Sequence, residues 1–267
     1  MRILVKSDDV NPRVMEGLHN AAFDCGFTSL IWNERAKASF DIVHEFNPDL
    51  VICYGSSAGS AIESACNNYS VDIVNVLSDE QALTSKEESL KAICYKPSAD
   101  LLKCDQDRTK EHDIITLSEM QNRQILKLSK LGLKCFSYNN RISLPCYLGT
   151  VTSEESHQLL CSSKMFLLLS EDEELMCNCI ASDCIPMFLN NNFLTDDILE
   201  GYRTQESFEL GIQKVISDDE YRAGIVDKSR QFLFSNHTYH HRLSEVMKAI
   251  KKDEEATSIL KRLEDYK

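Results

Sequence analysis

The sequence predicts an α/β protein made of two Rossmann-like domains with parallel sheets. Short apolar runs alternate with segments of helical periodicity along most of the chain. This alternation is typical of βαβ units, whose helices cover both faces of a parallel sheet. A polar stretch between about residues 78 and 113 divides the alternation into two series. We therefore expect one domain over 1–95, a second over 96–250 and a charged C-terminal helix over 251–267.

The first series contains four strand-like runs with helical segments between them. The strand-like runs are 2–5, 28–32, 50–54 and 71–77, and the helical segments begin near residues 12, 40 and 60. Asn11-Pro12 marks a helix start, because the missing amide hydrogen of proline is not needed in the first helical turn. Trp32 is the only tryptophan, and it ends a strand-like run, so we expect it in the core.

The second series is longer and ends in consecutive helices. Its strand-like runs are 114–117, 133–138, 165–169 and 184–189, and its helical segments are about 119–131, 153–162, 173–182, 205–216, 218–234 and a last one from about 238. Gly132 ends the first of these helices, at the position where a left-handed residue is common.

The composition limits the classes of partner. The 267 residues include 29 Lys and Arg against 42 Asp and Glu, which gives a net charge of −13. Nucleic acid and anionic membranes are therefore unfavourable as main partners, because phosphate binding needs clustered cations. An enzyme that modifies DNA bases is disfavoured on the same ground unless one wall of its cleft is locally basic. No apolar run approaches the ~18 residues of a membrane span, so we expect a cytoplasmic protein without integral membrane association.

Eleven cysteines, an odd number, are spread through apolar stretches. This distribution is typical of free thiols in a reducing compartment, and we expect all eleven to be unpaired. Cys177, Cys179 and Cys184 could be imagined as a metal cluster. Their spacing is not that of a C-x₂-C knuckle, and buried structural thiols are much commoner. We therefore expect no bound metal.

Two loops of the first series carry candidate chemistry. The loop with Gly55, Ser56, Ser57 and Gly59 joins a buried strand to a helix, where amide groups and the helix dipole favour an anionic ligand. A tight turn that needs small residues is the alternative. Asp8-Asp9 follows the first strand, as in the acidic pocket of response-regulator receiver domains, but no phosphoacceptor Asp ends the third strand. Asp8 could instead cap the next helix.

Residues 129–242 resemble the C-terminal domain of GT-B glycosyltransferases, and most closely that of the CgeB-like group. The resemblance is carried by four segments in the expected order: Leu131 to Tyr138, Leu148 to Glu155, Leu160 to Leu168, and Asn236-His237-Thr238-Tyr239-His240-His241-Arg242. The last segment is similar to the family pattern "HTYehR". In the family it begins the last helix, which packs back towards the N-terminal domain. The resemblance therefore implies a structural role for the three histidines of this segment, with His237 or Thr238 as the cap of the last helix.

The resemblance implies a metal-independent glycosyltransferase that uses a nucleotide-diphosphate sugar, with a UDP-sugar as the expected donor and no other cofactor. The donor would bind mainly to the second domain and an unknown acceptor to the first, across a cleft. The implied donor-site residues are Tyr138, Asn139, Arg141, Ser170, Asn178 and Asp183. The loop at Gly55 to Gly59 would face the acceptor, and Asp8 and Asp9 are the candidate catalytic residues.

The donor motif departs from the family pattern. Asn178 and Ser170 stand where many members carry two glutamates, Leu175 replaces an arginine, and Asp183 replaces a glycine. Asparagine can donate a hydrogen bond to a sugar, but it cannot supply a carboxylate. An active transferase is therefore one hypothesis, and the alternative is a catalytically silent scaffold that binds a nucleotide, a glycan or a protein.

Overall fold

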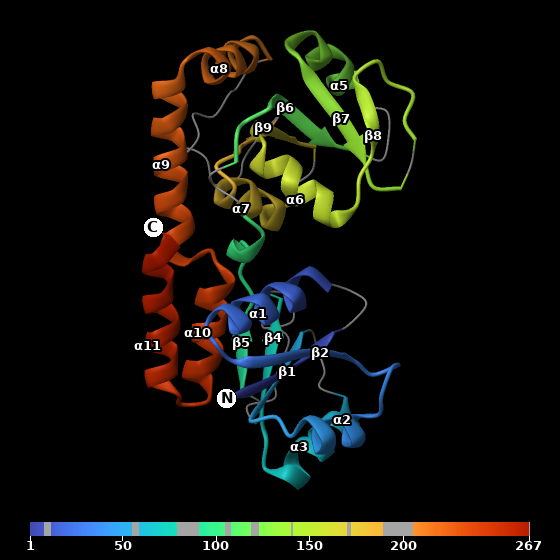
Figure 1. Ribbon diagram of the computed structural model, residues 1–267, viewed down its shortest axis with the longest axis vertical. Coiled ribbons are helices and arrows are strands. Elements are labelled where there is room, and N and C mark those ends of the chain that lie inside the picture. The colour runs from blue at the N-terminus through green and yellow to red at the C-terminus, as the bar shows by residue number, and fades with distance from the viewer. Residues whose placement is uncertain are drawn as a thin grey trace. The chain divides into compact units, whose positions relative to one another are not determined.

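The computed structural model contains two five-stranded sheets in which every strand pairing is parallel. It describes residues 1–7, 12–54, 59–78, 91–104, 108–118, 123–139, 141–169, 172–188 and 205–266. The chain divides into two compact units (Figure 1): unit 1 is Met1–Leu102 with His237–Lys267, and unit 2 is Lys103–Asn236. The predicted α/β class with two parallel sheets is confirmed.

The sheet of unit 1 has the strand order β2-β1-β3-β4-β5. Its strands are β1 (Arg2–Ser7), β2 (Thr28–Asn33), β3 (Leu50–Tyr54), β4 (Asp72–Leu77) and β5 (Ala92–Cys94), and the helices between them are α1 (Pro12–Asp24), α2 (Ser39–Phe46) and α3 (Ser60–Tyr69). Val5 in β1 lies between Ile31 and Ile52 of its two neighbours. The short strand β5 falls in the polar stretch and was not predicted from the sequence.

Both faces of this sheet are covered because side chains alternate along each strand. Ile3, Val5 and Ile52 pack into a cluster with α1 and the C-terminal helices. Leu4, Val51 and Trp32 face the other way and pack with α2 and α3. The predicted core position of Trp32 is confirmed, since its side chain is 3% exposed and its indole nitrogen donates to the carbonyl of Lys37.

The C-terminal helices belong to unit 1. They are α10 (Tyr239–Ala249) and α11 (Asp253–Arg262), followed by a 3₁₀ turn, η3 (Leu263–Tyr266). Thr238 caps α10 by accepting a hydrogen bond from the amide of His241, as predicted. Residues 237–250 were expected in the second domain, with the last helix packing back towards the first. The structure divides the chain differently, because Tyr239, Leu243 and Met247 are buried in the core of unit 1.

Unit 2 has the strand order β10-β9-β6-β7-β8. Its strands are β6 (His112–Leu117), β7 (Leu133–Ser137), β8 (Tyr147–Thr150), β9 (Ser163–Leu168) and β10 (Ile185–Phe188), and its helices are α5 (Arg123–Leu128), α6 (Ser153–Cys161), α7 (Glu173–Ala181), α8 (Gln205–Ser217) and α9 (Asp219–Asn236). One core cluster joins Ile114, Met165 and Ile185 from the strands with Phe208 and Ile212 from α8. None of the helices in the described ranges combines the length and apolar character that crossing a membrane requires.

Unit 1 contains a position where only glycine fits. A Cβ built on Gly17 of α1 would collide with the ring of Tyr239 on α10. We expect Gly17→Ala to lower the free energy of unfolding by roughly 1–3 kcal/mol, because a filled core must move to admit the methyl group.

Gly224 of α9 is a matched control. A Cβ at this helical position meets no atom within 4 Å, so Gly224→Ala should raise stability by roughly 0.5–1 kcal/mol through helix propensity alone. Chemical denaturation of both variants measures the two effects. Equal changes in the free energy of unfolding for the two variants would contradict the tight contact between α1 and α10.

Candidate functional site

The carboxyl edge of the unit 2 sheet brings two of the predicted donor-site residues together. All strands of a parallel sheet end at the same edge, and the helices that follow begin there. Tyr138 and Asn139 directly follow β7. Asn139 is exposed, whereas Tyr138 is half-buried and donates its hydroxyl hydrogen to Ser156 Oγ on α6 at 3.3 Å. Arg141 lies exposed in the connection from β7 to β8.

Two of the helix N-termini at this edge, those of α6 and α7, carry their own carboxylates. At α7, Asp172 Oδ1 accepts the amide hydrogen of Leu175 at 2.9 Å, and Glu173 and Glu174 occupy the first turn. At α6, Thr152 and Glu155 form a reciprocal capping box. Hydrogen bonding to Thr152 lowers the pKa of the Glu155 carboxyl. The Thr152 hydroxyl and the Asp172 carboxylate thus each accept from one helix amide, and the acidic side chains interact with the helix dipoles that a diphosphate would otherwise engage.

Asp183 lies at the opposite edge of the sheet. It follows α7 and precedes β10, and α7 carries the chain from the carboxyl edge back to the amino edge. The structure therefore does not bring Asp183 together with Tyr138 and Asn139. Its carboxylate pairs with Arg230 of α9 at 3.3 Å. Burial raises the pKa of the Asp183 carboxyl, against the opposing influence of Arg230 and Lys110.

The backbone explains why the family pattern has a glycine at position 183. Asp183 has a φ of 51°, in the left-handed region that glycine adopts without strain and that aspartate tolerates better than most residues. Asn178 lies within α7 and is 6% exposed. Its carbonyl accepts a hydrogen bond from the Ser182 hydroxyl at 2.9 Å. Both positions thus have local structural roles in the turn from α7 to β10.

The remaining sequence-predicted residues cannot be placed in the same way. Asp8, Asp9, Gly55, Ser56, Ser57 and Ser170 lie outside the described residues. Gly59 is described, and it is the residue before α3, with a φ of −55° that any residue can adopt. These residues follow β1, β3 and β9 in the chain, and their roles stay predictions.

An ammonium group joins two helix ends at the amino edge of the same sheet. Lys110 Nζ donates to the carbonyl oxygen of Cys161, which ends α6, at 2.9 Å and to that of Ser182, which caps α7, at 2.7 Å. Helix C-termini attract cations because their last carbonyls lack partners within the helix. Burial lowers the pKa of Lys110. This lysine was not singled out by the sequence, because nothing in its local pattern indicates which carbonyls it meets.

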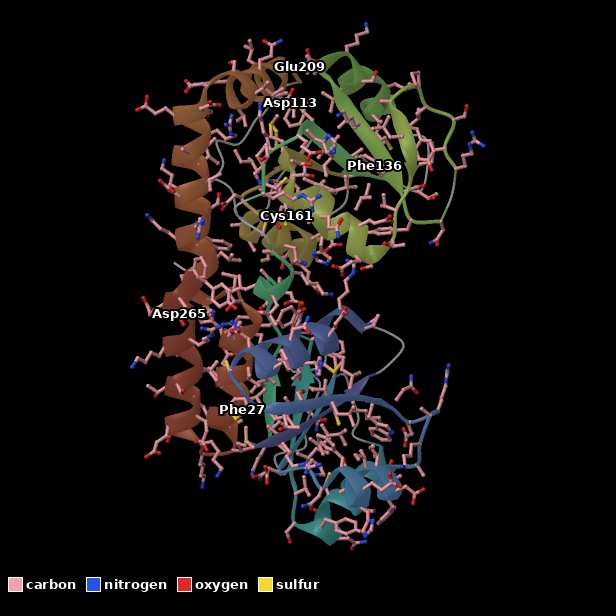
Figure 2. All side chains as sticks on the ribbon, viewed as in Figure 1. Phe27, Asp113, Phe136, Cys161, Glu209 and Asp265 are labelled. Atoms are coloured by element: carbon pink, nitrogen blue, oxygen red, sulfur yellow. The ribbon has the colours of Figure 1, made fainter. Side chains whose placement is uncertain are left out.

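We expect Lys110→Met to lower the unfolding free energy of unit 2 by roughly 1.5–3 kcal/mol, the range for a charged hydrogen bond. The substitution leaves both carbonyls without their shared donor while keeping most of the side-chain volume. Lys164→Met is the matched control, since Lys164 pairs at 2.7 Å with the half-exposed Asp113 of the same unit (Figure 2). Such a pair contributes about 0–1 kcal/mol. Equal denaturation midpoints for the two variants would contradict the helix-joining role.

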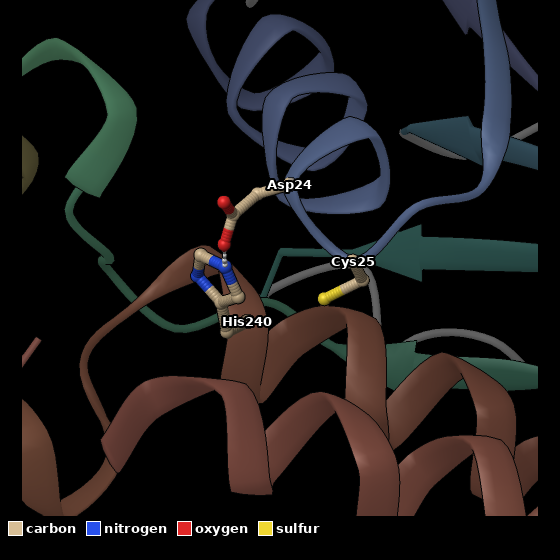
Figure 3. A group of neighbouring side chains, drawn as sticks. All are labelled: Asp24, Cys25 and His240. Atoms are coloured by element: carbon tan, nitrogen blue, oxygen red, sulfur yellow. Dashed lines mark hydrogen bonds and ion pairs between the residues drawn. The ribbon is translucent and has the colours of Figure 1, made fainter. Parts of the chain in front are cut away.

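A second polar cluster, in unit 1, was missed by the sequence analysis. Asp24, Cys25 and His240 place a carboxylate, a thiol and an imidazole within 4.8 Å of one another (Figure 3). Their side chains are of types that bind transition metals. Asp24, however, already accepts hydrogen bonds from His240 Nε2 at 2.9 Å and from Arg262 Nη2 at 2.9 Å and Nε at 3.1 Å.

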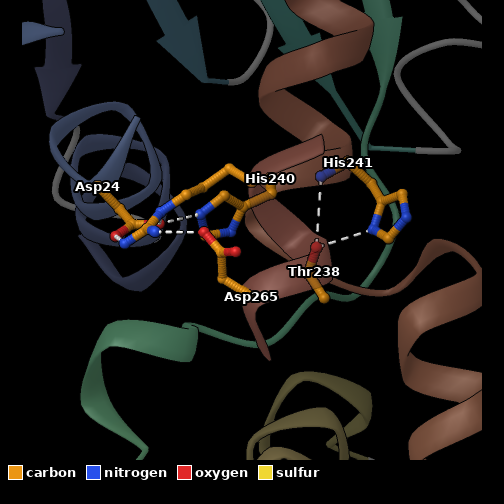
Figure 4. A network of polar contacts seen from close by, with 6 residues as sticks. Asp24, Thr238, His240, His241 and Asp265 are labelled. Atoms are coloured by element: carbon orange, nitrogen blue, oxygen red, sulfur yellow. Dashed lines mark hydrogen bonds and ion pairs between the residues drawn. The ribbon is translucent and has the colours of Figure 1, made fainter. Parts of the chain in front are cut away.

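The chemistry of this cluster favours a structural role over a metal site. The guanidinium of Arg262 donates two hydrogen bonds to the Asp24 carboxylate. It therefore already occupies, with its own positive charge, the oxygens that a metal ion would need as ligands. Burial raises the pKa of the Cys25 thiol to about 12, which disfavours the thiolate that binds metals. The network instead fastens α1 to α10 and to α11, with Arg262 also donating to Asp265 (Figure 4). Its residues are separated by up to 238 positions, so no local sequence signal could have found it.

His240 gives this network a pH dependence. Its Nε2–H donates to Asp24, and its buried Nδ1 has no hydrogen-bond partner among the described residues. A proton on Nδ1 would therefore be a buried donor without an acceptor. Desolvation by burial accordingly lowers the pKa of His240, and the hydrogen bond to Asp24 opposes this.

The stability that neutral His240 contributes should therefore be fully present above about pH 6.5, the ordinary pKa of histidine. The free energy of unfolding should fall as the pH drops from there towards the lower pKa of His240 in the folded state. One proton limits the slope to about 1.4 kcal/mol per pH unit. His240→Gln keeps a donor to Asp24 but cannot titrate, so its unfolding free energy should be flatter over the same window. Urea denaturation between pH 5 and pH 7.5 compares the two proteins, and parallel profiles would rule out His240 as the source.

The fold of this chain is similar to that of several solved glycosyltransferase structures. No protein-family model matches the chain, and no curated protein matches it in sequence. A glycosyltransferase from Rickettsia africae aligns over 94% of this chain and 98% of its own, with a TM-score of 0.59 and 12% identity. HepE from Anabaena, solved in complex with UDP, aligns over 93% and 99%, with a TM-score of 0.54 and 9% identity. The spinosyn forosaminyltransferase SpnP aligns over 94% and 99%, with a TM-score of 0.53 and 10% identity.

Proposed function

We propose that this protein is a glycosyltransferase that moves a sugar from a nucleoside-diphosphate donor to an acceptor hydroxyl without a metal ion. The observation that carries the proposal is the fold likeness to glycosyltransferases over more than nine-tenths of the chain. Two similar structures are complexes with UDP and with dTDP, which supports a nucleoside diphosphate as the leaving group and a UDP-sugar as the first donor to test. The CgeB-like subgroup stays a prediction from the sequence motifs.

The donor would lie at the carboxyl edge of unit 2. Arg141 is the exposed cation in the connection after β7, and its guanidinium suits a diphosphate that gains charge as the glycosidic bond breaks. The Tyr138 side chain, fixed by its hydrogen bond to Ser156, and the exposed Asn139 amide would orient the nucleoside or the sugar. Asp8 and Asp9, which follow β1 in the chain, remain the candidates for removing the acceptor's proton.

A catalytically silent scaffold is the second candidate, and a specific observation favours it. Asp172, Glu173 and Glu174 place three acidic side chains at the start of α7, and a capping box closes the start of α6. Asn178 stands where many family members carry a glutamate. A protein that kept the fold but lost the reaction would tolerate the acidic helix start and the loss of the glutamate. Such a protein would bind a nucleotide, a glycan or a protein without turnover.

A screen with UDP-, GDP-, ADP- and dTDP-sugars separates the candidates. We expect a UDP-sugar to raise the melting temperature, because ligand binding to the native state adds about 2.7 kcal/mol at a hundredfold excess over Kd. We also expect slow release of UDP by hydrolysis or transfer, measured by chromatography. Stabilisation without any UDP release would favour the silent scaffold. No stabilisation and no release with all four donors would contradict both nucleotide-based candidates.

Arg141→Ala tests the placement of the donor in the same assays. A charged hydrogen bond contributes about 1.5–3 kcal/mol, so affinity for the nucleoside diphosphate should fall roughly tenfold to a hundredfold. Lys130→Ala is the matched control, because Lys130 is an equally exposed cation that precedes β7 at the other edge of the sheet. Calorimetry that finds the same loss for both variants would move the site away from Arg141.

A further inference from the structure

Two thiols of unit 2 contact one and the same hydroxyl group. Cys104 follows the 3₁₀ turn η1 (Leu101–Lys103), and Cys161 is the last residue of α6 (Figure 2). The Ser182 hydroxyl lies 3.5 Å from the Cys104 sulfur, and the Cys161 thiol donates to Ser182 Oγ at 3.7 Å. Cys161 also donates to the carbonyl of Lys103, next to Cys104, at 3.9 Å. Both sulfurs thus contact the same small side chain.

The surroundings suit a reactive pair. Cys104 is partly exposed and Cys161 is buried, so a solvent-borne oxidant reaches the first before the second. The Lys110 ammonium, which binds the Cys161 carbonyl at 2.9 Å, also interacts electrostatically with the Cys161 thiol. An accessible thiol beside a resolving thiol is the usual arrangement of redox-responsive cysteines.

We propose that Cys104 and Cys161 form a reversible disulfide when the protein meets a peroxide. In the first step the Cys104 sulfur attacks hydrogen peroxide, the O–O bond breaks, and Cys104 sulfenic acid and water form. In the second step the Cys161 sulfur attacks the sulfenic sulfur, the S–O bond breaks, and the hydroxyl leaves as water with the Cys161 proton. Two thiols are oxidised, one peroxide is reduced, and two waters are released.

The Ser182 hydroxyl keeps a hydrogen-bond partner during this step. Ser182 Oγ also donates to the Asn178 carbonyl at 2.9 Å, so its hydrogen keeps a partner when the sulfurs move together. The disulfide would tie the first residues of unit 2 to the end of α6, close to the Lys110 contacts described above. A cross-link between segments so distant in the chain restricts the unfolded state and raises the stability of unit 2.

Other thiol pairs of unit 2 also lie close together. Cys135 interacts electrostatically with Cys146, which is partly exposed, so the Cys146→Ser variant below also tests that pair. Cys179 and Cys184 are hydrogen-bonded to each other through their side chains, and both are buried. Neither sulfur reaches solvent, so an oxidant would need an opening of unit 2 to reach them. A disulfide between Cys179 and Cys184 is therefore a separate outcome that the experiment can distinguish.

The experiment uses the full chain treated with equimolar hydrogen peroxide. Free thiols are then alkylated in denaturant without reductant, and the digest is analysed by mass spectrometry. We expect a cross-linked peptide pair that contains Cys104 and Cys161, together with a higher melting temperature that dithiothreitol reverses. Cross-linking of Cys179 to Cys184 instead would overturn the proposal, and so would oxidation of Cys104 to sulfinic acid with Cys161 alkylated.

Two variants test which thiols cause the rise in melting temperature after peroxide treatment. Cys104→Ser changes a partly exposed position and should abolish the peroxide-dependent rise in melting temperature. Cys146→Ser is the matched control, since Cys146 is also partly exposed in unit 2 and should keep the full rise. A rise that survives in Cys104→Ser would show that another pair is oxidised. The wild-type peptide map decides the question even if a variant folds poorly.

Discussion

The direction of the strands is the constraint on which the rest of this structure depends. In a parallel sheet every strand must be followed by a segment that carries the chain back, and that segment is usually a helix. Each connection therefore has one end at the carboxyl edge and the other at the amino edge. In unit 2, α6 and α7 start at the carboxyl edge and end at the amino edge. The place of a residue in the segment between two strands thus decides at which edge of the sheet it lies and which site it can belong to, whatever its residue type.

The two edges of unit 2 carry different chemistry as a result. At the amino edge the helix C-termini leave carbonyl oxygens, and these are bound by Lys110, with the Asp183–Arg230 pair alongside. At the carboxyl edge the helix N-termini leave amides, and the side chains of Thr152 and Asp172 accept from them. The dipoles are satisfied internally at both edges. A ligand at the carboxyl edge therefore has to compete with these existing contacts.

The sequence predicted the elements that its apolar pattern determines and missed those that depend on distant partners. Runs such as 50–54 and 165–169 became central strands because burial on both faces requires continuous apolar residues. The edge strands β5 and β8 are short and partly exposed, so no apolar run indicates them. Asp183 was assigned to the donor site from a motif, although the reversal along α7 separates it from Tyr138. The contacts between Asp24, His240 and Arg262 join three helices that only the tertiary fold brings together.

The magnitudes decide whether the acidic helix start excludes a nucleoside diphosphate. Two like unit charges about 4 Å apart in water repel each other by about 1 kcal/mol, so the three acids at the start of α7 would oppose an anion bound there by roughly 1–3 kcal/mol in total. One charged hydrogen bond from an arginine contributes about 1.5–3 kcal/mol. The two effects are of similar size, so a diphosphate held by Arg141 alone would gain little net affinity. Selectivity for a donor would then rest on uncharged contacts to the base and the sugar, which the acidic side chains do not weaken.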